Sequence, residues 1–305
     1  MKLAAGTVAD THTTTIDAKV VTIVSDPGAK LSLTGPGIIL RVQSDGADVQ
    51  IYDLEITAGI GAANPAISVP AGGSPKLGLT RVVVDGNPGA GISIEGGMLT
   101  MSHSTVLRNQ GIGVSVASAA LTISSSLIST NTGGGVSISR AQFDISNSFI
   151  VENGGAASVL GGLDISNIVT SDGIHRLDFN TITANLGPPT IALNTGINCG
   201  TVGTLLTFDS NIIYGNVVTV GGQQLGGSAM CTASYSDVGP SAAAGATNLN
   251  APPMFAAAAE GNFHLASTSP CRDAADPAAN VGDDFDGDAR PQGARRDIGA
   301  DELLP

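Results

Sequence analysis

Residues 105–124 read TVLRNQGIGVSVASAALTIS, and the same pattern recurs on both sides of them. The matching stretches are VVVDGNPGAGISIEGGMLTM at 82–101, LISTNTGGGVSISRAQFDIS at 127–146 and FIVENGGAASVLGGLDIS at 149–166. One Asn of each copy, at positions 87, 109, 131 and 153, marks a constant interval. A fixed period of about 20 to 50 residues is typical of solenoids and other stacked repeats.

Each copy consists of short alternating runs of apolar and small polar residues. Ile92-Ser93-Ile94 is followed one period later by Val114-Ser115-Val116, and Gly pairs and triplets separate the runs. A period of two indicates short strands with one buried face, and the glycines disfavour helix and supply tight corners. We therefore predict an all-β solenoid with about 22 residues per coil. Equivalent positions should form ladders, with the columns Ile92/Val114/Val136 and Val106/Ile128/Ile150 in the core.

An Asn column runs through the repeats. We interpret this column as structural, because Asn tolerates the left-handed conformation and stacked amides hydrogen-bond along the axis. The same interpretation holds for the Ser/Asn column five positions earlier in each copy. The Asn column comprises Asn87, Asn109, Asn131, Asn153, Asn185 and Asn216.

Composition excludes several classes of protein. The chain carries 13 basic and 26 acidic residues, a net charge of -13, which argues against nucleic acid as a partner. No apolar run approaches the roughly 18 residues of a membrane span, so we expect no membrane insertion. The opening MKLAAGTVAD is too short and too soon polar for a complete signal peptide, and we expect that a leader is lacking from this sequence.

The repeats and the tail together resemble a known family. The motifs are SNIIYGN, MCTASYSDV, PPMF, GNFHLASTSPCRDAAD and the region DFDGDARPQGARRDIGADE. They resemble secreted bacterial right-handed parallel β-helix proteins of pectate-lyase-like fold that carry a choice-of-anchor Q type C-terminal region. The resemblance implies a right-handed parallel β-helix and a secreted or cell-surface location. It implies no single activity, because this fold hosts many functions.

We expect two segments of one domain. Residues 1–240 are predicted to form the parallel β-helix, and residues 241–305 a C-terminal traverse and cap packed on the end of the helix. An open solenoid end exposes strand edges and core side chains, so terminal elements are expected to cover it. Phe263, Leu265, Cys271, Phe285 and Ile298 are the expected apolar plugs.

The three cysteines, Cys199, Cys231 and Cys271, cannot all pair within the chain. We predict a disulfide between Cys199 and Cys231 that joins neighbouring coils, and a free, buried Cys271. A bond between Cys231 and Cys271 is the alternative, and it would require the tail to fold back onto the last coil.

The tail also carries a candidate calcium loop. Asp284, Asp286 and Asp288 are spaced like the start of an oxygen-rich Ca²⁺ loop, but the twelfth position is Arg295 instead of Glu. We expect nearby arginines to neutralise this cluster by ion pairing, and Ca²⁺ remains the alternative cofactor.

Two inserts, of about 10 residues each, lengthen the last repeat intervals, and inserts in solenoids often form the binding side. The best catalytic candidates lie near the first insert, in SDGIHRLD: Asp172, His175, Arg176 and Asp178. Stepping by one period along the other columns assembles no set of three carboxylates, and Asp144 and Asp164 are predicted to occupy similar coil positions.

Three functions follow from these patterns. We expect an extracellular or cell-surface protein that binds a polysaccharide or cell-envelope glycan without catalysis, or that has a structural or adhesive role. A polysaccharide lyase or glycoside hydrolase with its site near 160–178 and 191–207 is the alternative. A flat, ice-type binding surface built on Thr100 and Thr122 is the third, and it is weakened because Asp144 and Asp164 interrupt the array.

Overall fold

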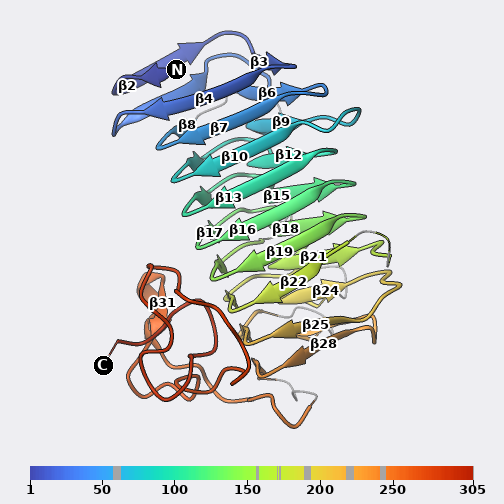
Figure 1. Cartoon of the computed structure of the whole chain (residues 1–305), viewed down its shortest axis with the longest axis vertical. Coiled ribbons are helices and arrows are strands. Elements are labelled where there is room, and N and C mark those ends of the chain that lie inside the picture. Colours follow the sequence, from blue (N-terminus) through green and yellow to red (C-terminus); the bar gives the residue numbers. More distant parts are fainter. Residues whose placement is uncertain are drawn as a thin grey trace.

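A computed structural model describes residues 1–57, 63–155, 158–169, 171, 173–188, 194–217, 223–240 and 245–304. The chain winds into an elongated stack of parallel coils of about nine turns, with the tail beside the last coils (Figure 1). Nearly every coil contributes one strand to each of three parallel sheets, called here sheets A, B and C. Asp172 lies outside the described residues. No helix among the described residues is long and apolar enough to cross a membrane.

The strands of the three sheets are short. Sheet A consists of β1 (Lys2–Leu3), β4 (Val20–Ser25), β7 (Asp48–Tyr52), β10 (Lys76–Thr80), β13 (Met98–Ser102), β16 (Ala120–Ser124), β19 (Gln142–Ser146), β22 (His175–Asp178), β25 (Leu206–Asp209) and β28 (Cys231–Ser234). Sheet B consists of β2 (Gly6–Asp10), β5 (Ala29–Leu33), β8 (Glu55–Thr57), β11 (Val83–Asp85), β14 (Thr105–Leu107), β17 (Leu127–Ser129), β20 (Phe149–Val151), β23 (Thr181–Thr183), β26 (Ile212–Tyr214) and β29 (Asp237–Gly239). Sheet C consists of β3 (Thr14–Asp17), β6 (Leu40–Gln43), β9 (Ile67–Val69), β12 (Ile92–Ile94), β15 (Ile112–Ala117), β18 (Gly134–Ser139), β21 (Leu163–Ser166), β24 (Ile197–Cys199) and β27 (Leu225–Gly227).

The predicted register is confirmed in the central coils. Val114 pairs with Ile92 on one side and Val136 on the other, and all three side chains are fully buried. Lys76, Met98, Ala120 and Gln142 pair in sequence, each one predicted period after the last. Other coils are longer, and the average turn is about 25 residues. The stacked aliphatic side chains between the three sheets form one continuous core.

The fourth repeat departs from the expected alignment. Its LDIS segment, β21, pairs with β18 of sheet C, so Asp164 stacks on Ser137. Asp144 lies on β19 of sheet A. The prediction that Asp144 and Asp164 occupy similar positions is therefore wrong. The segments FDIS and LDIS are alike in sequence, but connections of different length precede them, so they belong to different sheets.

The Asn column forms a buried amide ladder. The Nδ2 of each Asn donates to the Oδ1 of the next, at 2.8 to 3.0 Å, and the last, Asn216, donates to Gln224 Oε1. The left-handed conformation belongs to the preceding residue instead, as at Arg108 (φ 52°) and Thr130 (φ 54°). Because the buried amides find partners along the axis, the ladder holds each corner at little desolvation cost.

The tail lies along the side of the solenoid. It contains β30 (Phe255–Ala257), the 3₁₀ helix η2 (Ala258–Glu260) and β31 (Asn262–Leu265), and it continues as irregular chain (Figure 1). Its apolar residues pack on outward-facing side chains of sheet B and of the adjoining turn. Phe263 contributes to a cluster with Phe149 and Val151, and Leu265 to one with Ile212 and with Phe179, which lies between β22 and β23.

This placement differs from the cap expected on the solenoid end. Near that end, Leu249 adds one more rung to sheet B by hydrogen bonds with Ser236 and Val238. The rest of the tail covers the outer face of β20, β23 and β26. β20 and β26 carry apolar residues on the side that faces away from the core, and Thr181 of β23 accepts the backbone N–H of Ala300. The division of the chain at residue 240 stays a prediction.

Candidate functional site

The strand β22 separates the predicted catalytic residues onto its two faces. Arg176 and Asp178 point outward from sheet A and form an ion pair. His175 pairs in register with the buried Phe143, and the two rings pack at a centroid distance of 5.2 Å. The structure therefore brings Arg176 and Asp178 together and places His175 away from them.

Two further carboxylates join this pair on the outer face of sheet A. Asp209 lies in register with Asp178 on the next coil, and Asp144 lies in register with Arg176 on the preceding coil. We call Asp144, Arg176, Asp178 and Asp209 the sheet A cluster. The expectation that no set of three carboxylates assembles is thus wrong, because the inserts lengthen the step between these coils beyond one regular period.

The two stacked carboxylates have different surroundings. Burial raises the pKa of Asp178 and the charge of Asp209 adds to this rise, while the Arg176 guanidinium opposes it. Asp209 accepts hydrogen bonds from the hydroxyls of Ser210, at 2.6 Å, and Ser234, at 2.7 Å. A carboxyl whose burial favours its protonated form can act as a general acid, so Asp178 is the candidate acid of this cluster.

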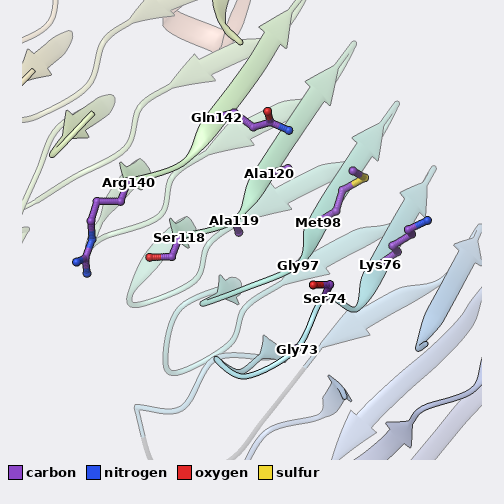
Figure 2. Close-up of a pocket in the computed structure, with 10 residues that line it drawn as sticks. All are labelled: Gly73, Ser74, Lys76, Gly97, Met98, Ser118, Ala119, Ala120, Arg140 and Gln142. Carbon is purple, nitrogen blue, oxygen red and sulfur yellow. The ribbon is translucent and has the colours of Figure 1, made fainter. Parts of the chain in front are cut away.

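A shallow groove adjoins the cluster on the same sheet. It has a volume of about 590 Å³ and is lined on opposite sides by Lys76 and Arg140 (Figure 2). Neither cation forms an ion pair with a carboxylate among the described residues. We call this site the basic groove; its lining is Gly73, Ser74, Lys76, Gly97, Met98, Ser118, Ala119, Ala120, Arg140 and Gln142.

The basic groove and the sheet A cluster form one continuous surface. Gln142 of the groove and Asp144 of the cluster both face outward from β19, two positions apart. Three coil steps separate Lys76 from the Gln142 coil, which is about 14 Å along the axis. Hydroxyl columns continue the surface on both sides, through Thr100, Thr122, Ser102, Ser124, Ser146, Thr207, Thr232 and Ser234. The surface is therefore long enough for several sugar units.

The threonine array of the third hypothesis is short. Thr100 and Thr122 stack in register, but the next positions of this column are Asp144 and Arg176. Charged side chains break the regular spacing that a flat ice-type surface needs.

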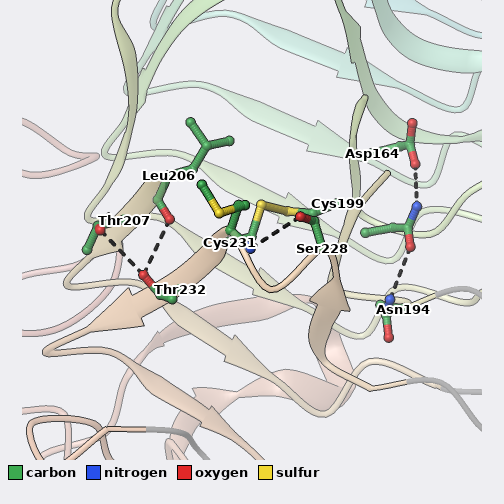
Figure 3. The surroundings of a disulfide bond; sticks show 10 residues. Asp164, Asn194, Cys199, Leu206, Thr207, Ser228, Cys231 and Thr232 are labelled. Atoms are coloured by element: carbon green, nitrogen blue, oxygen red, sulfur yellow. Dashed lines mark hydrogen bonds between the residues drawn. A yellow bond between two sulfur atoms is a disulfide. The ribbon is translucent and has the colours of Figure 1, made fainter. Parts of the chain in front are cut away.

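The predicted disulfide between Cys199 and Cys231 is present, with a Cα–Cα distance of 6.4 Å, and it joins β24 of sheet C to β28 of sheet A (Figure 3). Beside it, Asn194 donates to Asn198, and Asn198 donates to Asp164 at 2.7 Å. Burial raises the pKa of Asp164, and the hydrogen bond from Asn198 opposes this rise. The Asp164 carboxyl is thus part of a polar ladder and stands apart from the sheet A cluster.

The three calcium candidates do not converge on one point. Asp284 is 1% exposed and its carboxylate accepts backbone N–H groups of Asp286, Asp288 and Glu302. This carboxylate organises the loop from within. Asp286 instead faces His264, with Nε2 and Oδ2 2.8 Å apart. Arg290 pairs with Glu302 in place of the candidate carboxylates.

Cys271 is free and buried, and it lies against Asp237. The thiol sulfur is 3.5 Å from Asp237 Oδ2, and burial raises the pKa of the thiol. Burial likewise raises the pKa of Asp237 to about 6, although a backbone N–H from Ala251 opposes the rise. A neutral thiol has low nucleophilicity, so Cys271 serves packing here.

Asp237 should make the stability pH-dependent. Its pKa is about 6 in the folded protein and near 3.9 unfolded, so the folded state holds the proton more tightly. The free energy of unfolding should therefore fall by roughly 3 kcal/mol as pH rises from about 4 to about 6, and stay level above that. In urea titrations Asp237→Asn should lose the Asp237 contribution and show a smaller fall than the wild type, whereas the exposed Asp17→Asn should keep the full fall. An unchanged slope in Asp237→Asn would contradict the assignment.

Comparisons with known proteins agree with this architecture. The family model described as "Right handed beta helix region" matches residues 81–246, more than half of the chain. The chain therefore belongs to the right-handed β-helix family, and the predicted hand of the solenoid is confirmed.

One solved structure extends the likeness over the whole chain. The crystal structure of pectate lyase Pel9A matches with a TM-score of 0.63 and 17% sequence identity, covering 99% of this chain and 87% of that chain. At this identity the likeness establishes the fold alone. No curated protein matches the sequence.

Proposed function

We propose that this protein binds an acidic polysaccharide across the outer face of sheet A without cleaving it. The observation that carries the proposal is the basic groove, which holds two cations without carboxylate partners among the described residues, in a chain of net charge -13. Lys and Arg side chains bind carboxylates by charge-assisted hydrogen bonds. The groove therefore suits the carboxylates of uronate sugars.

The remainder of the surface suits sugar hydroxyls. Asp144 and Asp209 offer acceptor oxygens, and the serine and threonine columns offer both donors and acceptors. A polysaccharide that extends from the basic groove to the sheet A cluster would place its carboxylates at Lys76 and Arg140 and its hydroxyls at the carboxylates of Asp144 and Asp209. The pectate lyase named above shares the fold, and pectate is itself an acidic polysaccharide, so it is the first ligand to test.

We further propose an extracellular or cell-surface location. A disulfide persists in oxidising compartments and is rare in the cytosol. The tail motifs resemble the choice-of-anchor Q type region of secreted bacterial proteins, which supports the same location.

Isothermal titration with galacturonate oligomers tests the binding proposal. Lys76→Ala/Arg140→Ala should weaken binding at least tenfold, about 1.4 kcal/mol, because it removes two charge-assisted contacts. The control Lys2→Ala/Arg272→Ala also removes one lysine and one arginine, but at exposed positions outside the groove. It should bind as the wild type does. Equal weakening in both variants, or tighter binding of a neutral glucan, would refute the proposal.

Cleavage is the second candidate function, favoured by the raised pKa of Asp178 beside Asp209. In a hydrolase the protonated Asp178 would serve as the acid and Asp209 as the base or nucleophile. Reducing-end and ultraviolet assays on galacturonate oligomers distinguish hydrolysis from elimination. Product formation that disappears in Asp178→Asn and Asp209→Asn would replace the binding proposal with this one.

A further inference from the structure

We propose that His264, Asp286 and Asp301 form a binding site for a divalent transition-metal ion such as Zn²⁺. One ligand atom from each residue lies within 4.8 Å of the other two. The three residues come from separate segments of the tail: β31, the loop after Asp283, and the segment close to the C-terminus. A metal bound here would join these segments directly.

The histidine ring is oriented with its lone pair toward the carboxylates. Asn262 Oδ1 accepts the backbone N–H of His264 at 3.1 Å and lies 2.6 Å from Nδ1 of the ring. Because Asn262 Oδ1 can only accept a hydrogen bond, Nδ1 of His264 is the donor and carries the ring hydrogen. In the neutral ring Nε2 is then an acceptor, yet it lies 2.8 Å from Asp286 Oδ2, which is also an acceptor. Two acceptors at this distance need a cation or a proton between them.

Asp301 supplies an independent observation. Its side chain is largely buried, with 7% of the residue exposed, and Oδ2 accepts the backbone N–H of Leu265 at 2.7 Å. Its other oxygen accepts no hydrogen bond from the described residues. This second oxygen is not one of the fully buried, unpaired oxygens of the described residues, so it keeps access to solvent and is free to bind a metal ion.

The donor set selects the class of metal. One imidazole nitrogen and two carboxylate oxygens suit Zn²⁺, Co²⁺ or Ni²⁺, whereas Ca²⁺ takes six to eight oxygen ligands. In a tetrahedral zinc site, neighbouring ligand atoms lie about 3.3 Å apart. The 2.8 Å between Nε2 and Oδ2 needs only a small opening to admit the ion. Asn262 also fixes the ring from outside, as the hydrogen-bond partners of metal-binding histidines do.

The site would fasten the tail to sheet B. The His264 ring packs on Phe149 of β20 at a centroid distance of 5.3 Å and on Phe285 at 6.2 Å. Metal binding should therefore hold the β31 segment and the Asp286 loop against the same strand. A ligand that binds only the folded protein stabilises it in proportion to the logarithm of its concentration.

The test is calorimetric titration of the full chain, stripped by a chelator, with Zn²⁺, Co²⁺ and Ca²⁺ separately. We expect one equivalent of Zn²⁺ or Co²⁺ to bind, the melting temperature to rise with Zn²⁺, and both effects to weaken at acidic pH, where protons compete for the ligands. Asp286→Asn should reduce Zn²⁺ affinity at least tenfold. Because Asp286 is exposed, this variant should fold normally, and His264→Gln provides a second loss-of-ligand variant.

Asp288→Asn is the matched control, since it neutralises a carboxylate of the same loop outside the three ligands. It should bind Zn²⁺ as the wild type does. The proposal is overturned if no Zn²⁺ or Co²⁺ binds, if Asp286→Asn and His264→Gln leave the affinity unchanged, or if the chain binds Ca²⁺ in preference and loses it in Asp288→Asn.

Discussion

Val114→Asp should unfold the protein or destabilise it by at least about 4 kcal/mol. Val114 is fully buried and stacks between Ile92 and Val136, so the new carboxylate would lie in an aliphatic column without a partner. Urea unfolding followed by far-ultraviolet circular dichroism measures the loss. Because Val114 points into the core between the three sheets, an aspartate at this position would have no direct access to water.

The neighbouring position provides the matched control. Ser115 lies on the same strand but faces outward between Ser93 and Ser137, and it is partly exposed. Ser115→Asp should therefore cost less than about 1 kcal/mol, as surface changes usually do. Similar losses for the two variants would contradict the assigned faces of β15.

Arg290→Gln should destabilise the protein by about 3 to 5 kcal/mol, the usual cost of removing one member of a buried ion pair. The Arg290 side chain is fully buried. Its guanidinium donates to the carbonyls of Asp297, at 2.9 Å, and Gly299, at 2.8 Å, and it pairs with Glu302 at 3.3 Å. It also lies over the Phe179 ring of the solenoid at 4.9 Å. Without it, the buried Glu302 carboxylate loses its cation.

The exposed Arg295 is the control for this experiment. It bonds the carbonyl of Asp273 at the surface, so Arg295→Gln should change stability by less than about 1 kcal/mol. Limited proteolysis should show faster cleavage within 250–304 for Arg290→Gln than for Arg295→Gln. Wild-type stability and wild-type cleavage rates in Arg290→Gln would show that the tail does not depend on this residue.

The fold could be predicted because equivalent residues recur at a constant interval in the sequence. The constant step between repeats places Ile92, Val114 and Val136 in one column, and the amide ladder needs Asn at the same step. Regular stacking therefore brings residues one period apart into contact on neighbouring coils. The disulfide could be predicted on another ground, because Cys199 lies in the second insert and Cys231 just after the last repeat, so both are near the end of the solenoid.

The candidate site was only partly predictable, because it lies where the number of residues per coil departs from the regular period. Asp178 and Asp209 continue the column of Ser124 and Ser146, but the inserts lengthen the sequence interval between these positions. Counting by one regular period therefore does not place them together. His175 was grouped with Arg176 by proximity in sequence, although neighbouring strand residues face opposite sides. The alternation of apolar and charged residues in Arg176-Leu177-Asp178 predicts that Arg176 and Asp178 share one face and that His175 lies on the other.

The sequence of β20 also indicates where the tail packs. Phe149 and Val151 flank the core-facing Ile150, so both point outward from sheet B and need a cover. Their apolar character predicts that another segment packs there. The metal ligands His264, Asp286 and Asp301 had no such signal, because an irregular chain has no period that relates their positions.

The most direct test of the account is a crystal structure of the protein with a bound galacturonate oligomer. We predict that the oligomer lies across the outer face of sheet A, with carboxylates at Lys76 and Arg140 and hydroxyls toward Asp144 and Asp209. An oligomer bound instead on sheet B, on sheet C or on the tail would contradict the proposed binding surface.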